Sequence, residues 1–415
     1  MIKVSVVIAT YNTAAYLEEC LKSIFAQTLR EIEIIIIDDG STDNTRDIIK
    51  KYINLGKNII YKYQENQGAG IARNYGISLV TGEFMIFMDP DDIYPNTDCI
   101  EKLYLACIEN NVEICGGTVL TINGSQIKVE YKAGNGIENH TVNEVVKAKS
   151  FNYLYGHQRY MFKTLLIKAN NITYAAYKRY EDQVFTIKAL GIAQRFFELD
   201  YPVYAKRINY RDDSWWEINV YTDIFKGFRD TLKLILQYDF EMMFINNYPS
   251  FIELYFPRIC QFAYNGNDEF DRVIDDINDI VKGSKYFEEE YLISENRVKK
   301  YRNSIKEEIE AIKNILKAEK KIIIYGAGQY TKKFVKEYKN DLRNVIGIAV
   351  SQKKKDENEI CGIKIAQITD YLGIKEDVFV IITPGGNIKN DIIQTLNDLN
   401  FLRYRWIDVN KVYKG

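Results

Sequence analysis

The sequence predicts an α/β protein built on two sheets of mainly parallel strands, joined by a helical middle region. Up to Met88, short apolar runs alternate with stretches of helical spacing, which is typical of parallel strands connected by helices. The same alternation begins again near residue 320, beyond a long stretch of helical pattern. A chain of 415 residues has room for two or three domains. We expect domains over residues 1–215, 216–318 and 319–415.

The expected strands of the first sheet are short runs rich in Ile, Val and Phe. Continuous apolar runs are typical of strands that helices cover on both faces, whereas half-exposed strands alternate. These runs are Val4–Ala9, Glu33–Ile37, Ile59–Tyr63 and Glu83–Met88. Apolar residues at helical spacing lie between them and predict helices at Ala14–Phe25, Thr42–Ile53 and Ala69–Leu79.

Beyond residue 110 short alternating runs indicate antiparallel additions, which make the first sheet mixed. We expect such strands at Glu113–Ile122 and Ile127–Tyr131, and further strands at Ala193–Leu199 and Val203–Ile208. The segment YEDQVFTIKAL, residues 180–190, opens a helix between them.

The middle region, residues 216–318, is helical in pattern. The turn residues Asn247-Tyr248-Pro249 are expected to interrupt it. Its last part, Ser294–Lys317, is long, charged and amphipathic, and we expect it to bridge two domains as a single helix.

The last segment begins with KKIIIYGAG, a buried-type strand that runs into a Gly-rich turn. It resembles the start of the Rossmann-like domains attached to sugar-modifying enzymes. Gly326 and Gly328 leave room for a phosphate near a helix start. However, Thr331 replaces the third glycine of the fingerprint, and the strand Val345–Val350 ends without an acid for a ribose. These departures disfavour a nicotinamide cofactor; nucleotide binding without chemistry and a docking or dimerising role stay open.

Composition excludes several classes of site. The net charge of −2 gives no reason to expect a nucleic-acid partner. The six cysteines form no CxxC pair, and the two histidines cannot build a three-histidine metal site. No apolar run approaches the roughly 20 residues that a membrane-spanning helix needs. We expect a soluble cytoplasmic protein, with peripheral contact to the inner membrane face as an open addition.

Polar residues follow three of the predicted parallel strands at the point where each strand ends. They are Thr10-Tyr11-Asn12, Asp38-Asp39-Gly40-Ser41 and Asp89-Pro90-Asp91-Asp92. Ligands of open α/β sheets bind at the carboxyl ends of the strands, so these segments should converge on one crevice. Three carboxylates among four residues repel one another unless something positive lies among them.

Four stretches in this order carry a resemblance to a known family: VSVVIATYNTAAYLEECLKSIFAQT, IIIIDDGSTDNT, ENQGAGIARNYGISLVTGEFMIFMDPDD and YEDQVF. Residues 1–215 resemble the family-2 glycosyltransferases of the GT-A fold. The resemblance implies an inverting transfer of a sugar from a nucleoside-diphosphate sugar, by default a UDP-sugar, with Mn²⁺ or Mg²⁺ as cofactor. It also implies a glycan or lipid-linked glycan acceptor of the capsule, lipopolysaccharide or teichoic type.

The segment Asp89-Pro90-Asp91-Asp92 resembles the DxD motif of that family. The resemblance implies that Asp91 binds the metal, that Asp89 lies near the ribose, and that Asp92 contacts the sugar. Oxygen ligands from one or two carboxylates, completed by substrate phosphates, suit these cations. A plain turn is the alternative, because Asp and Pro favour turns.

Other matches imply contacts to the nucleotide. Asp39 would accept a hydrogen bond from the base, although its segment also suits a helix cap. Arg73, in the Gly-rich stretch with Gly68, would support the base or the diphosphate; the alternative is a surface arginine. The first strand end, Thr10, Tyr11 and Asn12, would line the nucleoside, with Tyr11 equally open to a packing role.

Glu181 and Asp182 resemble the ED motif of the family. A sugar hydroxyl is a poor nucleophile while protonated, so a base is needed. The resemblance assigns that base to Asp182 and acceptor orientation to Glu181, and the alternative is a pair of acids at a helix start. Arg211, in a basic stretch that also holds Arg207, is a candidate for contact with the diphosphate.

Two other classes of function stay open. A nicotinamide-dependent sugar-nucleotide oxidoreductase would use the Gly326–Gly328 turn. A non-catalytic sugar-nucleotide-binding scaffold would bind the donor without turnover. A homo-oligomer formed through the C-terminal domain is compatible with each of these functions.

Overall fold

The fold is taken from a computed structural model, which describes residues 1–123, 126–128, 143–152, 156–208, 217–352, 358–384, 386–407 and 409. The chain forms two compact units. The first comprises Met1–Phe256 and Phe262–Ile293, and the second comprises Pro257–Gln261 and Ser294–Gly415. The helical region expected at 216–318 is divided between them, and its boundaries stay predictions.

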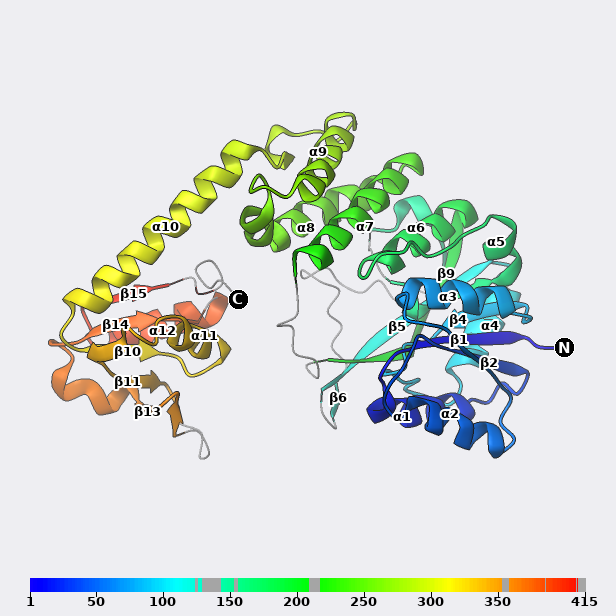
Figure 1. Ribbon diagram of the computed structural model, residues 1–415, viewed down its shortest axis with the longest axis horizontal. Coiled ribbons are helices and arrows are strands. Elements are labelled where there is room, and N and C mark those ends of the chain that lie inside the picture. The colour runs from blue at the N-terminus through cyan, green and yellow to red at the C-terminus, as the bar shows by residue number, and fades with distance from the viewer. Residues whose placement is uncertain are drawn as a thin grey trace. The chain divides into compact units, whose positions relative to one another are not determined.

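In the part of the chain that is described, the first unit holds a nine-stranded mixed sheet (Figure 1). The strand order is β3-β2-β1-β4-β8-β5-β9-β7, and β6 pairs with β5. The parallel strands are β1 (Val4–Thr10), β2 (Ile32–Asp38), β3 (Ile59–Tyr63) and β4 (Phe84–Phe87). The remaining strands are β5 (Ile114–Asn123), β6 (Gln126–Lys128), β7 (Glu144–Lys147), β8 (Tyr160–Lys163) and β9 (Arg195–Arg207).

Strand β8 makes the sheet mixed, because it runs antiparallel to both β4 and β5. Antiparallel pairing is expected at Glu113–Ile122 and Ile127–Tyr131 and is confirmed for β5 and β6, whereas β8 itself was not predicted. The two strands predicted at Ala193–Leu199 and Val203–Ile208 are one strand, β9. Its register with β5 shifts beside Thr118, so the chain passes Asp200-Tyr201-Pro202 without leaving the sheet.

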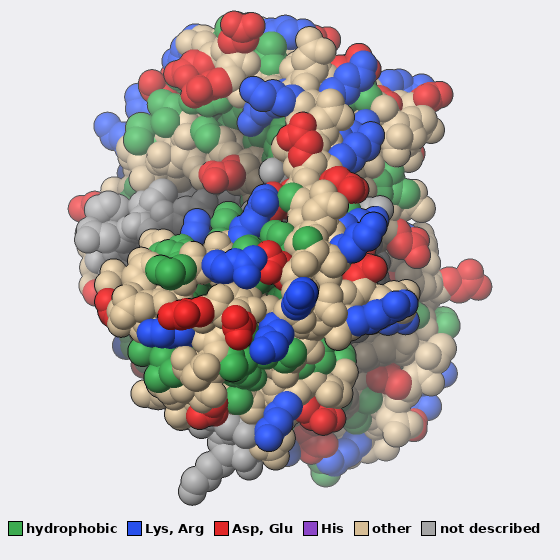
Figure 2. Space-filling view, turned by 90° about the vertical axis from the view of Figure 1, so that its left-hand side faces the viewer, with side chains coloured by type: hydrophobic (Ala, Val, Ile, Leu, Met, Phe, Trp, Pro, Cys, Tyr) green, Lys and Arg blue, Asp and Glu red, His purple; other side chains and the backbone are tan. Residues whose placement is uncertain are grey.

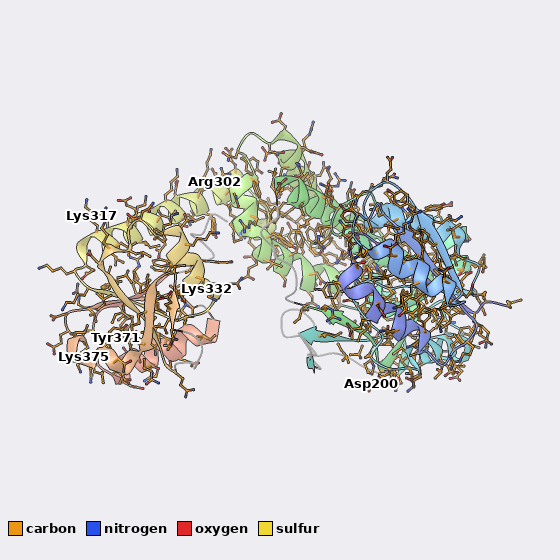
Figure 3. The ribbon with its side chains drawn as sticks, turned by 60° about the horizontal axis from the view of Figure 1, so that its bottom comes forward. Asp200, Arg302, Lys317, Lys332, Tyr371 and Lys375 are labelled. Atoms are coloured by element: carbon orange, nitrogen blue, oxygen red, sulfur yellow. The ribbon has the colours of Figure 1, made fainter. Side chains whose placement is uncertain are left out.

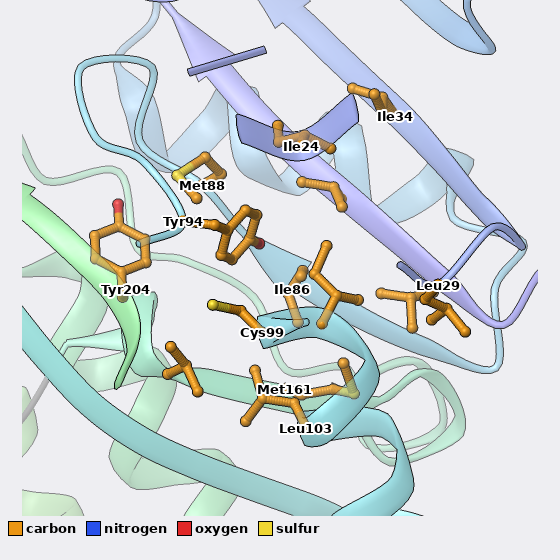
Figure 4. Packing of buried hydrophobic residues seen from close by; sticks show 14 of the residues in the cluster. Ile24, Leu29, Ile34, Ile86, Met88, Tyr94, Cys99, Leu103, Met161 and Tyr204 are labelled. Atoms are coloured by element: carbon orange, nitrogen blue, oxygen red, sulfur yellow. The ribbon is translucent and has the colours of Figure 1, made fainter. Parts of the chain in front are cut away.

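Helices cover both faces of the first sheet. On one face, apolar side chains of β1 pack with those of α1 (Ala14–Phe25), α2 (Thr45–Asn54) and α4 (Cys99–Glu109). Figure 4 shows part of this core, with Cys99 and Leu103 of α4 near Met161 of β8. On the other face lie α3 (Ala69–Leu79) and α6 (Glu181–Ala193), while the short α5 (Thr164–Ala169) follows β8.

Helix α3 packs unusually close to the sheet. A Cβ atom built at Gly76 would overlap Cγ1 of Val7 on β1. A Cβ at Gly70 would lie 2.6 Å from the carbonyl oxygen of Ala175. Glycine at these positions therefore lets the helix backbone approach its neighbours, which brings Arg73, one turn beyond Gly70, under the carboxyl ends of the strands.

The helical part of the first unit contains α7 (Ile218–Gln237), α8 (Glu241–Phe262) and α9 (Asp268–Lys282). The turn predicted at Asn247-Tyr248-Pro249 is wrong, because α8 runs through it. The ring of Tyr248 stacks on Phe244 at 5.3 Å, and the ring of Phe251 stacks on Phe228 of α7 at 3.4 Å. Burial of aromatic rings on both sides outweighs the helix hydrogen bond that Pro249 cannot donate.

The second unit begins with α10 (Glu295–Ala318) and holds a second sheet of order β12-β13-β11-β10-β14-β15. Its strands are β10 (Ile322–Tyr325), β11 (Val345–Val350), β12 (Glu359–Ile360), β13 (Ile363–Gln367), β14 (Phe379–Ile382) and β15 (Tyr404–Trp406). All pair in parallel except the edge strand β12.

Helices flank this sheet as well. Helices α10 and α11 (Gln329–Glu337) pack on one face, and η6 (Ile368–Ile374) and α12 (Gly386–Asp398) pack on the other. Tyr371 of η6 lies against Gly347 of β11 (Figure 3). On the face shown in Figure 2, acidic and basic side chains are interspersed and do not form a basic patch. Among the described helices, none has the length and apolar character needed to cross a membrane.

Candidate active site

The first two polar strand ends are linked by hydrogen bonds. Thr10 ends β1 and is buried, and its hydroxyl shares a hydrogen bond of 2.6 Å with that of Thr13. Asn12 has a left-handed backbone, with φ of 50°. Its side-chain oxygen accepts from the backbone N–H of Thr42 at 2.8 Å. Tyr11 is 49% exposed, so its ring is not part of the core and is available to line a ligand.

Asp39 anchors the Gly-rich segment. It is buried, and Oδ1 accepts hydrogen bonds from Gln64 Nε2 at 2.7 Å and from the Gln67 amide at 2.9 Å. Oδ2 accepts from the Gly68 amide at 2.8 Å. A carboxylate has about four lone-pair directions, so three internal donors leave it limited capacity for a nucleoside base. The first effect of Asp39 is to fix the loop that leads into α3.

Gly68 is the residue at which that loop turns into α3. Its φ of 94° is in the region that favours glycine. A Cβ there would meet no described atom within 4 Å. Glycine is needed here for backbone conformation, while the space above it is open to a ligand.

Arg73 joins two of the predicted motifs. Nη2 forms an ion pair of 2.8 Å with Asp89 Oδ1, and Nη1 forms one of 2.8 Å with Glu181 Oε1. The Arg73 side chain is only 9% exposed, so the alternative of a surface arginine is wrong. The guanidinium therefore couples the end of β4 to the start of α6.

Asp89 is held from several directions. Oδ2 accepts from Gln158 Nε2 at 3.2 Å, and the Asp89 amide donates to Tyr204 Oη at 3.1 Å. Burial alone would raise the pKa of Asp89, but the charge of Arg73 outweighs it and holds that pKa well below its usual range. Asp89 is thus an ionised partner of Arg73, and it also closes a turn by accepting the Asp92 amide at 3.1 Å.

Asp92 is buried beside other negative charges. Its carboxylate accepts from Tyr204 Oη at 2.8 Å and from the Arg207 amide at 2.7 Å. Burial, together with the charges of Asp89 and Asp91, raises the pKa of Asp92 to about 8. The negative charge of these three carboxylates is therefore not fully compensated by the positively charged side chains around them.

Asp91 is the predicted metal ligand, and its surroundings fit a divalent cation. It is buried beside Asp92, and its backbone oxygen accepts from Arg207 Nε at 3.0 Å. Two adjacent carboxylates, completed by phosphate oxygens, are the usual ligand set for Mg²⁺ or Mn²⁺. Among the described residues, no group of three or more His, Cys, Asp and Glu side chains forms a metal cage on its own. The donor set thus suits a cation that arrives with its substrate.

Glu181 and Asp182 lie in the first turn of α6. Tyr180, the residue before them, has a left-handed backbone with φ of 71°, which is uncommon for a large side chain. Its ring packs on Phe228 and Phe251, and Gly227 of α7 leaves room for its backbone. The helical region therefore fixes where α6 starts and how its two acids are directed.

Asp182 has an unusual proton affinity. Burial and the neighbouring charge of Glu181 raise the pKa of Asp182 to about 7, while Arg73 acts in the opposite direction. Oδ1 accepts from the amide of Gln183 at 3.0 Å. The position of Asp182 is compatible with both predicted roles, the general base and an acid at a helix start. A general base works best when its pKa is near neutrality, as it is here.

Some site residues lay beyond sequence reasoning, and one prediction cannot be placed. Arg211 lies outside the described residues, whereas Arg207, from the same stretch, contacts both Asp91 and Asp92. Gln158 and Tyr204, which hold the acidic loop, belong to none of the matched motifs. The only signal in the sequence was the place of Gln158 between the acidic and ED motifs and of Tyr204 at the start of the basic stretch.

His157 is fully buried between the rings of Phe87 and Tyr174. Neither ring nitrogen has a hydrogen-bond partner within the described part of the chain, and Nε2 lies 4.0 Å from Asp89 Oδ1. Burial and the charge of Arg73 hold the pKa of His157 well below its ordinary value, so the ring is neutral. It separates the acidic cluster from the apolar core.

Comparisons with known proteins agree with these motifs. Residues 5–170 match the model of glycosyl transferase family 2. A putative glycosyltransferase EpsH of Bacillus subtilis is 32% identical over 50% of this chain and 61% of its own length. A poly(ribitol-phosphate) beta-glucosyltransferase of Bacillus spizizenii is 33% identical over 49% of this chain and 32% of its own length. The chain thus spans less than two thirds of either relative.

Among solved structures, S. aureus TarS residues 1–349 in complex with UDP-GlcNAc has 25% sequence identity and a TM-score of 0.55. The match covers 68% of this chain and 81% of that one. The mixed sheet, the order of the four motifs and this likeness point to the same fold. The N-terminal part of this chain is therefore a family-2 glycosyltransferase domain of the GT-A fold.

Proposed function

We propose that this protein is a metal-dependent, inverting glycosyltransferase that moves a sugar from a UDP-sugar to a hydroxyl of a cell-surface glycan. The observation that carries the proposal is the continuous link from Asp89 through Arg73 to Glu181, with Asp182 beside it. These residues come from three separated motifs, yet they form one cluster at the carboxyl ends of the strands. Burial and Glu181 raise the pKa of Asp182 to about 7, and carboxylates shifted in this way are concentrated at active sites, which favours an enzyme over a scaffold.

In this proposal Asp182 accepts the proton of the acceptor hydroxyl while that oxygen attacks the sugar. Glu181, oriented by Arg73, positions the acceptor. A single attack from the side opposite the departing diphosphate inverts the anomeric centre. Tyr11, Asn12 and Gly68 line the nucleoside, and Thr10 and Asp39 hold these segments in place.

The diphosphate end of the donor belongs beside Asp91 and Asp92. Asp91 would hold a divalent cation, which when bound supplies positive charge next to the departing diphosphate, and Asp92 would contact the sugar. Asp89, neutralised by Arg73, lies on the ribose side. Arg207, which contacts the acidic loop, is a cation available for the phosphates, and Arg211 stays a prediction.

The acceptor we propose is a polyol-phosphate or related surface glycan. The poly(ribitol-phosphate) beta-glucosyltransferase among the relatives supports this class, and the UDP-GlcNAc complex of TarS supports a UDP-sugar donor. A cytoplasmic location with contact to the inner membrane face, and oligomerisation through the second unit, stay predictions.

The oxidoreductase alternative is less well supported by the second unit. A Cβ at Gly326 would lie 2.6 Å from Cγ of Pro384, so the proline ring covers the Gly-rich turn. The Thr331 hydroxyl donates to the Gly326 carbonyl at 2.7 Å and lies 2.7 Å from that of Thr383. These contacts pack the first glycine of the turn, whereas a Cβ at Gly328 would meet no described atom within 4 Å. What disfavours a dinucleotide is therefore the missing third glycine and the missing ribose acid.

A donor panel tests the proposed function. UDP-, GDP-, dTDP- and CDP-sugars are each added with and without Mn²⁺, and the unfolding midpoint is measured. A UDP-sugar with Mn²⁺ is expected to raise it most, because a ligand at 100 times its Kd stabilises the folded state by about 2.7 kcal/mol. Asp91→Ala should remove the Mn²⁺-dependent part of the shift. No shift with any donor would contradict the proposal.

Turnover should also depend on pH through Asp182. The base works only when ionised, and its pKa is raised to about 7. Turnover is therefore expected to rise with pH and to level off above about pH 7, measured at saturating donor and Mn²⁺. A profile that is flat from pH 5 to pH 9, or that falls through pH 7, would argue against this assignment.

A further inference from the structure

A short segment, Gly156–Gln158, lies against the acidic cluster although none of the family motifs includes it. Gln158 donates to Asp89, and His157 lies beside the same carboxylate. Gly156 lies against Asp182. This short segment therefore contacts Asp89, which the proposed function places near the donor, and Asp182, which it places near the acceptor.

The contact at Gly156 is very close. A Cβ atom built there would overlap Asp182 Oδ2 and Gln158 Oε1, and it would lie 3.2 Å from Asp182 Cγ. Gln158 has two further rotatable bonds with which to move its amide aside. The Asp182 carboxylate sits on a short side chain at the start of a helix, so it has fewer ways to move.

The backbone of Gly156 does not itself require glycine. Its φ is −71° and its ψ is 176°, an extended conformation that any residue adopts. Glycine is needed at this position because of the space that its missing side chain leaves. That space holds the carboxylate of Asp182.

We propose that Gly156 is a positioning residue for Asp182: the absence of a side chain at residue 156 defines where the base carboxylate lies. The proposal rests on the proposed function, in which Asp182 is the base. Any side chain at this position displaces Oδ2 from its present place. Displacement of a reacting group by about 1 Å lowers the rate on the order of 10²-fold.

The test compares Gly156→Ala with the unmodified protein, using the full chain with UDP-sugar and Mn²⁺. Turnover is expected to fall by about 10²-fold, because the carboxylate that accepts the proton is displaced. The acid limb of the pH profile should move away from pH 7, since the displaced carboxylate leaves its present neighbours. A purely structural glycine would not move that limb.

Gly283→Ala is the matched control. Gly283 ends α9 with ordinary backbone angles, and a Cβ there would make only ordinary contacts, the nearest at 3.4 Å. It lies outside the site, so turnover and its pH profile should stay unchanged. A similar loss in both variants would overturn the proposal.

A double-mutant cycle separates this proposal from the proposed function. If Asp182→Asn leaves turnover unchanged, the proposed function fails. If Asp182→Asn lowers turnover but Gly156→Ala does not, only the role of Gly156 fails. If both lower it, Gly156→Ala added to Asp182→Asn is expected to cause little further loss, because the base is already absent.

A second cycle covers a Gly156→Ala protein that folds poorly. Asp182→Ala removes the carboxylate that a new Cβ would overlap. The unfolding midpoint should therefore fall less on Gly156→Ala in the Asp182→Ala protein than in the unmodified one. An equal fall in both backgrounds would show that residue 156 and Asp182 are not coupled, and would overturn the proposal.

Discussion

Replacing Asp182 with asparagine is expected to lower turnover by about 10²–10⁴-fold, the usual contribution of a general base. The amide keeps the shape of the carboxylate but cannot take up the proton of the acceptor hydroxyl. Binding of the donor should change little, because Asp182 lies on the acceptor side in the proposed arrangement. Initial rates at saturating donor, together with the donor-induced shift of the unfolding midpoint, measure both expectations.

Asp200→Asn is the control for this substitution (Figure 3). Asp200 is exposed on β9, so the same chemical change there should leave turnover unchanged. Equal activity of Asp182→Asn and the unmodified protein would exclude Asp182 as the base.

Asp182→Asn should also change how the stability of the protein depends on pH. The pKa of Asp182 is higher in the folded protein, about 7, than in an unfolded chain, about 3.8. The folded state therefore holds this proton more tightly, and the unmodified protein loses stability as pH rises from about 4 to 7. Asp182→Asn lacks this titration. The unfolding midpoint of the variant minus that of the unmodified protein should therefore increase as pH rises across this range.

The second large effect is expected at Arg73. Arg73→Met leaves Asp89 and Glu181 buried without their shared cation, which should reduce the free energy of unfolding by about 3–5 kcal/mol at neutral pH. Urea unfolding followed by circular dichroism measures this loss. The pKa of Asp89 is lowered in the folded protein, so the stabilisation by Arg73 is present above about pH 4 and is lost as pH falls below it.

Lys22→Met provides a comparison for the loss at Arg73. Lys22 pairs with Glu18 at 3.0 Å, but the two side chains are 65% and 38% exposed. Such surface pairs contribute at most about 1 kcal/mol. Adding Glu181→Gln to Arg73→Met should restore part of the stability, because one buried charge is then removed. A loss at Arg73 no larger than at Lys22 would mean that the buried network does not stabilise the fold.

The parallel strands and the convergence of their ends could be predicted from sequence because both depend on local pattern. Ile59–Tyr63 and Val345–Val350 have the predicted bounds, since their apolar runs end at polar residues. Register and proline effects depend on distant contacts. A break between Leu199 and Val203 was predicted within β9, and a turn at Pro249 within α8, yet sheet pairing and ring stacking override both.

The site shows the same division. The motifs at the strand ends predicted which acids would gather, because parallel strands end at one edge of the sheet. The pairing of Arg73 with Asp89 and Glu181 depends on how closely α3 packs against the sheet. The segment Gly156–Gln158 has no pattern of its own, and its role follows only from what lies next to it in space.

The left-handed backbone at Tyr180 links the two acids of α6 to the helices α7 and α8, on which its ring packs. Relaxing this residue to ordinary angles would rotate the first turn of α6, and with it the two acids that follow. The rings of Phe228 and Phe251 oppose that relaxation. Substitutions in α7 or α8 are therefore expected to change the direction of both acids although these helices lie outside the four matched motifs.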